Sequence, residues 1–183
     1  MALTYSSMLE LGSDLKEFSL INSITNEKFH SAELESTKPT LIMFICNHCP
    51  YVIHYHQEIQ KLATDYLTQF NFVAISSNDI ENYPQDAPDK MKLLWNELQL
   101  NFPYLYDETQ EVAKGFKAEC TPEFYVFDIN KKLVYRGRFD ESSPGSEIDP
   151  SGIDVRTAMS ALLEGKLISE NQHPSMGCNI KWK

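Results

Sequence analysis

The sequence has 183 residues, of which 42% are hydrophobic and 23% are charged. That length is enough for one domain with a full apolar core, and the composition excludes a disordered or a fibrous chain. The formal charge of −10 excludes the phosphates of nucleic acids and anionic lipid headgroups as partners. We therefore expect a single domain over residues 1–183, without a nucleic acid or membrane partner.

The predicted elements begin with a β-ribbon over residues 15–29, added at the edge of a sheet. The apolar run "TLIMFI", residues 40–45, is typical of a strand buried on both faces. Beyond Pro50, apolar residues at steps of three and four predict a helix of about five turns that reaches Phe70. A second buried strand, residues 72–76, completes a βαβ unit with two parallel strands.

The second half predicts a short helix around residues 90–98, a strand at 102–107 and a helix at 108–116 with Asp107 as its N-cap. Strands at 123–128 and 132–139 form a hairpin, because a tight polar turn joins them. A final amphipathic helix ends at Gly165, and the tail, residues 166–183, packs back on the body. This order predicts an α/β fold in which helices flank a central mixed β-sheet.

The compartment follows from what the sequence lacks. No apolar run approaches the ~20 residues of a membrane span, and the N-terminus "MALTYSSMLELGSDLKEF" has neither the basic nor the apolar region of a signal peptide. We therefore expect a cytoplasmic protein. In a reducing cytoplasm, its four cysteines are more often redox-active, metal-binding or inert than structural disulfides.

The stretch "FICNHCPYV" places Cys46 and Cys49 at CxxC spacing on a strand-to-helix turn. The unpaired N–H groups and the positive dipole at a helix start favour a thiolate over a thiol. His48 adds a positive charge or a donor to that thiolate. We expect Cys46, at the strand end, to be the exposed nucleophile and Cys49, one helical turn in, to be the shielded resolving thiol.

Two alternative roles for the cysteines compete with this interpretation. Cys46 and Cys49 could be inert core residues beside a solvated histidine. Alternatively, a structural zinc site could recruit Cys120 and Cys178 as further ligands. Those two lie far apart in the sequence and belong to no second CxxC, so we expect no metal ion and no cofactor.

The stretch "ECTPEFYVFD" holds further candidates. Pro122 opens a strand, which places it at an edge, a bulge or a cis turn. Cys120 is either a third redox thiol or a small apolar filler. Glu123 is a candidate proton acceptor for the shielded thiol, a task that needs a raised pKa. In the tail, Cys178 either serves a resolving arm or packs with its neighbours, and we favour packing.

Together these motifs resemble the thioredoxin-like superfamily, specifically the peroxiredoxin-like relatives of alkyl hydroperoxide reductase and thiol-specific antioxidant. The resemblance covers nearly the whole chain and is carried by "FICNHCPYV", "AISSNDIENYPQDAPDKM", "FPYLYDETQEVAKGF", "CTPEFYVFD", "LVYRGRFDESSPG" and "PSMGCNIKWK". It implies a thioredoxin-like fold with an N-terminal β-ribbon and an inserted αβ segment. It also implies that Cys46 and Cys49 are the active-site pair, that Pro122 is the cis-proline facing them, and that Thr121 offers its backbone to a bound peptide.

The sequence departs from peroxiredoxins at the peroxide-binding positions. Cys49 aligns with their peroxidatic cysteine and precedes Pro50 as that cysteine often precedes a proline. However, Ile42 and Cys46 replace the proline and the threonine of the peroxiredoxin motif. Pro122 stands near the position of the peroxiredoxin arginine, and Arg136 or Arg138 is the candidate to replace that arginine. Donors aimed at the peroxide make that reaction fast, so the departures favour disulfide exchange.

The sequence therefore predicts a thiol–disulfide oxidoreductase in an antioxidant or redox-homeostasis role. Its substrate is a protein or small-molecule disulfide, and its reductant is thioredoxin or glutathione. Reduction of hydroperoxides is the alternative within enzymes, and a non-catalytic metal-binding protein is the alternative from another class.

Overall fold

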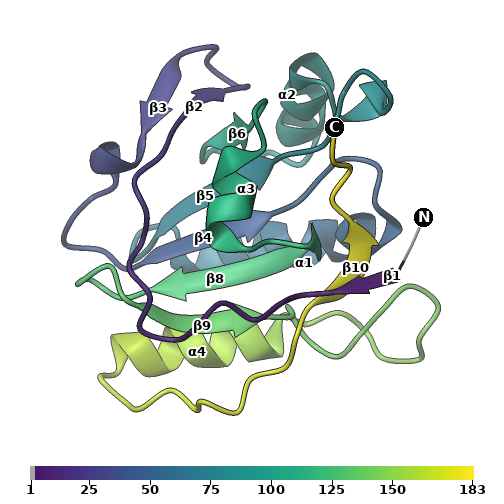
Figure 1. Cartoon of the computed structure of the whole chain (residues 1–183). Coiled ribbons are helices and arrows are strands. Elements are labelled where there is room, and N and C mark those ends of the chain that lie inside the picture. Colours follow the sequence, from purple (N-terminus) through teal and green to yellow (C-terminus); the bar gives the residue numbers. More distant parts are fainter. Residues whose placement is uncertain (1–2) are drawn as a thin grey trace.

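The computed structural model describes residues 3–183, and its largest feature is a seven-stranded mixed sheet covered by helices on both faces (Figure 1). The strands are β1 (Leu3–Tyr5), β2 (Ser19–Asn22), β3 (Lys28–His30), β4 (Thr40–Phe44), β5 (Asn71–Ser76), β6 (Tyr104–Tyr106), β7 (Cys120–Thr121), β8 (Glu123–Phe127), β9 (Leu133–Gly137) and β10 (Met176–Asn179). The helices are α1 (Pro50–Tyr66), α2 (Pro88–Glu97), α3 (Glu111–Phe116) and α4 (Ile153–Leu163), with single 3-10 turns at Ser31–Glu33 and Pro84–Asp86.

The large sheet has the strand order β3-β2-β6-β5-β4-β8-β9. At its centre, β4 pairs in parallel with β5 and antiparallel with β8. The predicted parallel βαβ unit and the predicted hairpin of β8 and β9 are therefore confirmed. The ribbon of β2 and β3 lies at one edge, as predicted. A central mixed sheet with flanking helices confirms the predicted fold class.

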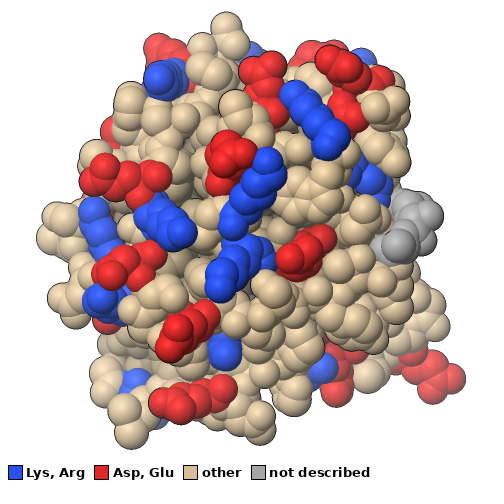
Figure 2. All heavy atoms as spheres, in the orientation of Figure 1, with Lys and Arg blue, Asp and Glu red and all other residues tan. Residues whose placement is uncertain are grey.

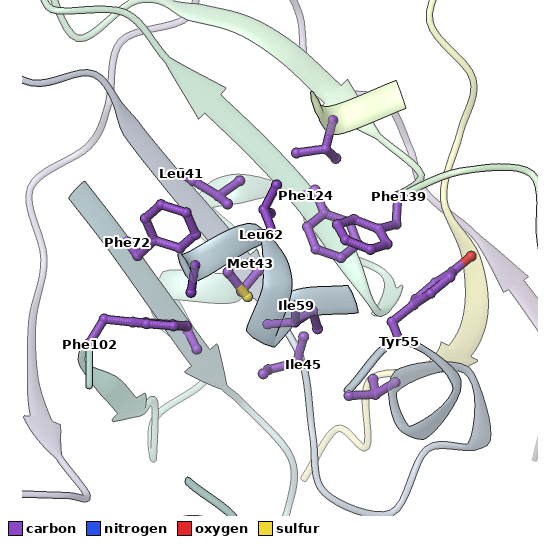
Figure 3. Packing of buried hydrophobic residues seen from close by; sticks show 14 of the residues in the cluster. Leu41, Met43, Ile45, Tyr55, Ile59, Leu62, Phe72, Phe102, Phe124 and Phe139 are labelled. Atoms are coloured by element: carbon purple, nitrogen blue, oxygen red, sulfur yellow. The ribbon is translucent and has the colours of Figure 1, made fainter. Parts of the chain in front are cut away.

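Successive side chains of the central strands point to opposite faces of the sheet and pack into two separate cores. Every residue of β4 is therefore buried, which explains its continuous apolar run. Leu41 and Met43 face α1, α2 and α4, whereas Ile42 and Phe44 face α3 and the segment that precedes β2. Figure 3 shows the first of these cores, where Ile59 and Leu62 of α1 meet the sheet. Because both faces are covered, the end of β4 is held rigidly.

Two predicted helices differ in extent from the observed ones. The helix α1 ends at Tyr66, and Phe70, which the apolar stripe had included, lies beyond it, although its side chain is buried. The helix α3 begins at Glu111 with Gln110 as its N-cap, so the predicted N-cap at Asp107 was wrong. Residues 107–110 instead form a turn, and the Asp107 carboxylate still accepts the Ala113 N–H at 2.9 Å.

A second, three-stranded sheet with the order β1-β10-β7 was not predicted. Its strands come from the start of the chain, its end and the segment before Pro122, and Figure 1 shows β1 and β10 side by side. Short strands that pair only with distant segments carry little local signal. This small sheet brings the C-terminal strand to Thr121.

The face of the molecule in Figure 2 carries acidic and basic side chains interspersed with one another. Within residues 3–183, no helix is long and apolar enough to cross a membrane.

The packing of α1 leads to a stability prediction. Leu62 on its buried face is 0% exposed, whereas Leu93 on α2 is 61% exposed. Leu62→Ala should lower the free energy of unfolding by ~2–5 kcal/mol, because it leaves a cavity in the core. Leu93→Ala is the matched control and should change it by less than about 0.5 kcal/mol. Urea unfolding measures both, and equal losses would contradict the packing described.

Candidate active site

The two motif cysteines lie where β4 gives way to α1. One more backbone hydrogen bond joins the chain to β5 after the end of β4: the Ile45 N–H donates to the Ile75 carbonyl oxygen at 3.0 Å. Helix α1 then begins at Pro50, so Cys49 is its N-cap. Both side chains are buried, Cys46 with 1% and Cys49 with 0% of its surface exposed.

The predicted exposure of Cys46 and the predicted place of Cys49 one turn into the helix were therefore wrong. Proline suits the first helical position, because it lacks the N–H that would be unsatisfied there and its φ angle is already helical. Pro50 thus starts the helix one residue after Cys49. Cys49 thus lies at the positive end of the helix dipole, and its carbonyl oxygen accepts the N–H groups of Val52 at 2.9 Å and Ile53 at 3.0 Å.

The two sulfurs differ in acidity. A hydrogen bond from the Cys46 thiol lowers the pKa of Cys49 to about 5, and donors from Cys178 and the Val52 backbone add to this effect against the cost of burial. The pKa of Cys46 is raised, by its hydrogen bond to Cys49, by burial and by the charge of Asp86. These opposite shifts make Cys49 the more acidic of the two thiols.

Thr121 contacts both sulfurs. Its hydroxyl oxygen lies 3.4 Å from Cys46 Sγ, and its carbonyl oxygen, at 3.2 Å, accepts a hydrogen bond from Cys49 when that sulfur is protonated. The peptide bond between Thr121 and Pro122 is cis. The predicted approach of Thr121 and Pro122 to the cysteine turn is therefore what the structure shows.

A fully buried carboxylate, Asp86, holds the cysteine turn in place. Its Oδ1 accepts the backbone N–H groups of Asn47 at 2.8 Å and His48 at 3.3 Å. Its Oδ2 accepts the Asn78 amide at 2.8 Å and lies 2.6 Å from His48 Nδ1. The ring of His48 also stacks on Tyr83, with 5.5 Å between centroids.

Sequence reasoning missed Asp86. The residue lies in the loop "NYPQDAPD", far along the chain from the cysteines, and neither its spacing nor its type links it to them. The resemblance included this loop among its motifs, and that was the one available signal. The carboxylate is nonetheless the group that fixes the orientation of His48.

Cys46, His48 and Asp86 form the one group within residues 3–183 that could hold a metal ion by distance, with one ligand atom of each within 4.8 Å of the others. Both oxygens of Asp86 already accept hydrogen bonds from protein donors. His48 Nε2 is buried and has no partner in the described part of the chain. The arrangement suits a histidine that receives a proton, because Asp86 orients the ring and leaves Nε2 open.

Glu123 lies on a different face of the sheet from the one expected of a proton acceptor for the shielded thiol. Glu123 accepts the Tyr125 hydroxyl at 2.7 Å and the Glu119 N–H at 3.1 Å. Because Tyr125 belongs to the core on the α3 side, Glu123 lies on the face of the sheet opposite α1. Burial raises the pKa of Glu123 to about 7. Cys120 is fully buried, and burial followed by the charge of Glu123 raises its pKa.

The two candidate arginines are bound elsewhere. Arg138 Nε lies 2.6 Å from Asp154 Oδ2, and Arg136 donates to Gln172 and to the Leu9 carbonyl. Both guanidinium groups are therefore engaged by other protein groups, and Arg138 also lines the hollow beside Pro122.

Cys178, for which packing was favoured, is the sulfur that the structure adds to the site. Its thiol and its backbone both donate hydrogen bonds to Cys49. Burial and this contact raise the pKa of Cys178 to about 12. The site thus holds three sulfurs, with Cys49 contacting the other two.

Two hollows lie on this side of the protein. One of about 200 Å³ is lined by Pro122, Tyr55, Phe139 and Met176 and opens beside the cis-proline. A larger one of about 320 Å³, between α4 and the tail, is lined by Ala158, Ile168 and Gln172 and lies away from the sulfurs. The smaller hollow is therefore the closer approach to the cysteine turn.

Comparison with known proteins places this geometry in context. Residues 10–153 match the Redoxin family model. An uncharacterized conserved protein from Geobacillus kaustophilus is 49% identical, covers 100% of this chain and 97% of its own, and superposes with a TM-score of 0.97. A hypothetical protein from Sinorhizobium meliloti is 38% identical over 98% of both chains, with a TM-score of 0.95.

More distant solved structures show the fold alone. Peroxidoxin BcpB from Mycobacterium tuberculosis is 18% identical, with coverage of 86% of this chain and 98% of its own and a TM-score of 0.64. A search of the curated proteins found no match. The thioredoxin-like fold expected from the resemblance is confirmed.

The position of Glu123 predicts a pH effect on stability. Its pKa in the folded protein, about 7, exceeds the ordinary value of 4.5. Between these two values the folded protein binds more protons than the unfolded chain, so stability falls as the pH rises. Glu123→Gln should remove this loss of stability, which is on the order of 3 kcal/mol. The free energy of unfolding of the variant should therefore rise relative to that of the wild type between about pH 5 and about pH 8.

Urea unfolding of the wild type and of Glu123→Gln at both pH values measures this difference. The same substitution at the exposed Glu141 is the control and should show no such gain. A Glu123→Gln difference that stays constant between the two pH values would show that this carboxyl titrates alike in both states.

Proposed function

The chain belongs to the Redoxin family, and from that premise we propose that it is a thiol–disulfide oxidoreductase whose working couple is Cys46 and Cys49. The observation that carries this proposal is that both sulfurs lie against Thr121, Cys46 Sγ 3.4 Å from its hydroxyl oxygen and Cys49 Sγ 3.2 Å from its carbonyl oxygen, beside the cis Thr121–Pro122 bond. Two thiols in direct contact, one ionised and one protonated, are the reactants of a dithiol–disulfide cycle.

The first step belongs to Cys49. Its thiolate attacks one sulfur of a substrate disulfide, forms a mixed disulfide and releases the other substrate sulfur as a thiolate. The low pKa of Cys49, caused chiefly by the Cys46 thiol, keeps this sulfur ionised near neutral pH. This order reverses the one expected from the sequence, because the helix begins after Cys49.

The second step belongs to Cys46. Its thiol gives up a proton and attacks Cys49 Sγ of the mixed disulfide, which releases the second substrate thiol and leaves a Cys46–Cys49 disulfide. We assign the proton acceptor to His48, because Asp86 orients its ring through Nδ1 and one of its ring nitrogens lies within 4.8 Å of the Cys46 sulfur. The substrate disulfide is thereby reduced to two thiols, and an external thiol such as thioredoxin or glutathione regenerates the dithiol.

The pairing of β10 with β7 favours a small-molecule disulfide as the substrate. Thr121 is in register with Cys178, so β10 occupies the edge of β7 beside the cis-proline. A polypeptide substrate would need that edge for backbone pairing. A small disulfide does not need it and can approach through the hollow at Pro122.

Hydroperoxide reduction is a second candidate, favoured by the thiolate on Cys49 directly before Pro50. In that reaction Cys49 attacks the peroxide bond, releases an alcohol or water and becomes a sulfenic acid. Cys46 then condenses with it to form the same disulfide and water. The engagement of Arg136 and Arg138 by other groups weighs against this candidate.

Steady-state turnover separates the two candidates. With an external reductant in excess, the wild type should reduce a small disulfide such as hydroxyethyl disulfide faster than it consumes hydrogen peroxide. Cys49→Ser should lower disulfide turnover by ~10³-fold or more, as expected for loss of a nucleophile. Cys46→Ser should lower turnover, and without the external reductant it should hold half of the substrate as a mixed disulfide on Cys49, detected by mass spectrometry.

The matched control is Cys120→Ala, which removes a fully buried thiol that has no part in the proposed cycle and should leave both rates unchanged. Peroxide consumption faster than disulfide reduction, abolished by Cys49→Ser, would favour the second candidate. Full disulfide turnover in Cys49→Ser and in Cys46→Ser would refute the proposed couple.

A further inference from the structure

The C-terminal strand brings a third thiol to the site along a defined register. In the small sheet, Cys178 of β10 is the antiparallel partner of Thr121, and Asn179 is the partner of Cys120. Thr121 is the residue whose hydroxyl and carbonyl oxygens contact Cys46 and Cys49. The register therefore places Cys178 opposite the residue that lines both motif sulfurs.

The close approach of β10 depends on Gly177. A Cβ atom at this position would lie 2.1 Å from the Thr121 carbonyl oxygen and 3.4 Å from Pro122 Cδ. Any other residue would push β10 away from β7. On its other edge, β10 pairs with β1, with Leu3 opposite Cys178 and Thr4 opposite Gly177. The strand is thus held on both edges, with no side chain to separate it from the cis-proline.

The contact between Cys178 and Cys49 is direct. The Cys178 side chain, 4% exposed, packs in the same core as Cys49, and its thiol donates a hydrogen bond to the Cys49 sulfur. Cys46 donates to that same sulfur. Cys49 can therefore exchange its disulfide partner between two thiols without a large movement of the chain.

We propose that Cys178 is a third redox thiol, which attacks Cys49 Sγ of the Cys46–Cys49 disulfide and forms a Cys49–Cys178 disulfide. One sulfur–sulfur bond forms as another breaks, and the proton of Cys178 goes to Cys46, which leaves as a thiol. The exchange is internal and needs no added oxidant. It rests on the proposed function, because it starts from the disulfide of that cycle.

The electrostatics of the site agree with this order of events. In the reduced protein, burial and then the contact with Cys49 raise the pKa of Cys178, while the charge of Lys181 lowers it. Once Cys49 is in a disulfide, its negative charge is gone and Lys181 remains. Oxidation of the motif thus favours ionisation of Cys178 at the moment when it has a disulfide to attack.

The exchange has a structural consequence for the tail. A Cys49–Cys178 bond would tie β10 covalently to the start of α1, while Cys46 returns to the reduced state. The reductant would then have to open a bond that includes the C-terminal strand. Cys178 would thereby determine which disulfide the external thiol reduces, Cys46–Cys49 or Cys49–Cys178.

Disulfide mapping tests this proposal without knowledge of the natural substrate. The full chain is oxidised with diamide, its free thiols are blocked in acid with N-ethylmaleimide, and its peptides are mapped without reduction. The wild type should contain both Cys46–Cys49 and Cys49–Cys178 disulfides. Cys46→Ser should contain the second alone, and Cys178→Ser should contain the first alone.

Two further variants separate geometry from mere proximity of thiols. Gly177→Ala keeps Cys178 but displaces β10, so it should lose the Cys49–Cys178 disulfide and keep the Cys46–Cys49 disulfide. Cys120→Ala removes the other buried thiol of the small sheet and should leave the wild-type pattern unchanged. Circular dichroism of each variant confirms that it is folded.

A wild type that contains Cys46–Cys49 but lacks Cys49–Cys178 would overturn the third thiol and leave the proposed function intact. A wild type with no disulfide at Cys49 would overturn the proposed function itself. A full amount of Cys49–Cys178 in Gly177→Ala would show that the register of β10 does not deliver Cys178.

Discussion

The start of α1 at Pro50 is the constraint on which the chemistry of the site depends. It makes Cys49 the N-cap residue, at the positive end of the helix dipole, which favours a thiolate on that sulfur. The thiols of Cys46 and Cys178 then become donors to Cys49. A helix that began earlier, at Cys46, would favour the opposite division of charge between the two motif sulfurs.

The surroundings of Cys49 come from segments that are distant in the sequence, and each restrains one side of the turn. Asp86 binds the backbone of Asn47 and His48 from the loop before α2. Thr121 and the cis-proline face the sulfurs from the strand end. The strand β10 adds the third side, through Cys178. The low pKa of the buried Cys49 is sustained because donors from Cys46, Cys178 and the Val52 backbone replace the water that burial removes.

Much of this could be predicted from the sequence, because local patterns determine it. The runs that form β4 and β5, the stripe on α1 and the turn between β8 and β9 each carry their own signal. The CxxC spacing and Pro122 located the site for the same reason. Asp86 and Cys178 could not be placed, since only tertiary packing brings them to the cysteines. The proposed order of Cys46 and Cys49 differs from the expected one because tertiary packing supplies part of the surroundings of Cys49, Cys178 among them.

The account rests on the claim that Cys49 carries the thiolate, and its ultraviolet thiolate absorbance as a function of pH tests this most directly. The wild-type absorbance should disappear as the pH falls through about 5. Cys49→Ser should remove this transition, whereas Cys46→Ala should keep it at a higher pH, because the strongest donor to the thiolate is lost. A transition that survives in Cys49→Ser and disappears in Cys46→Ala would contradict the account.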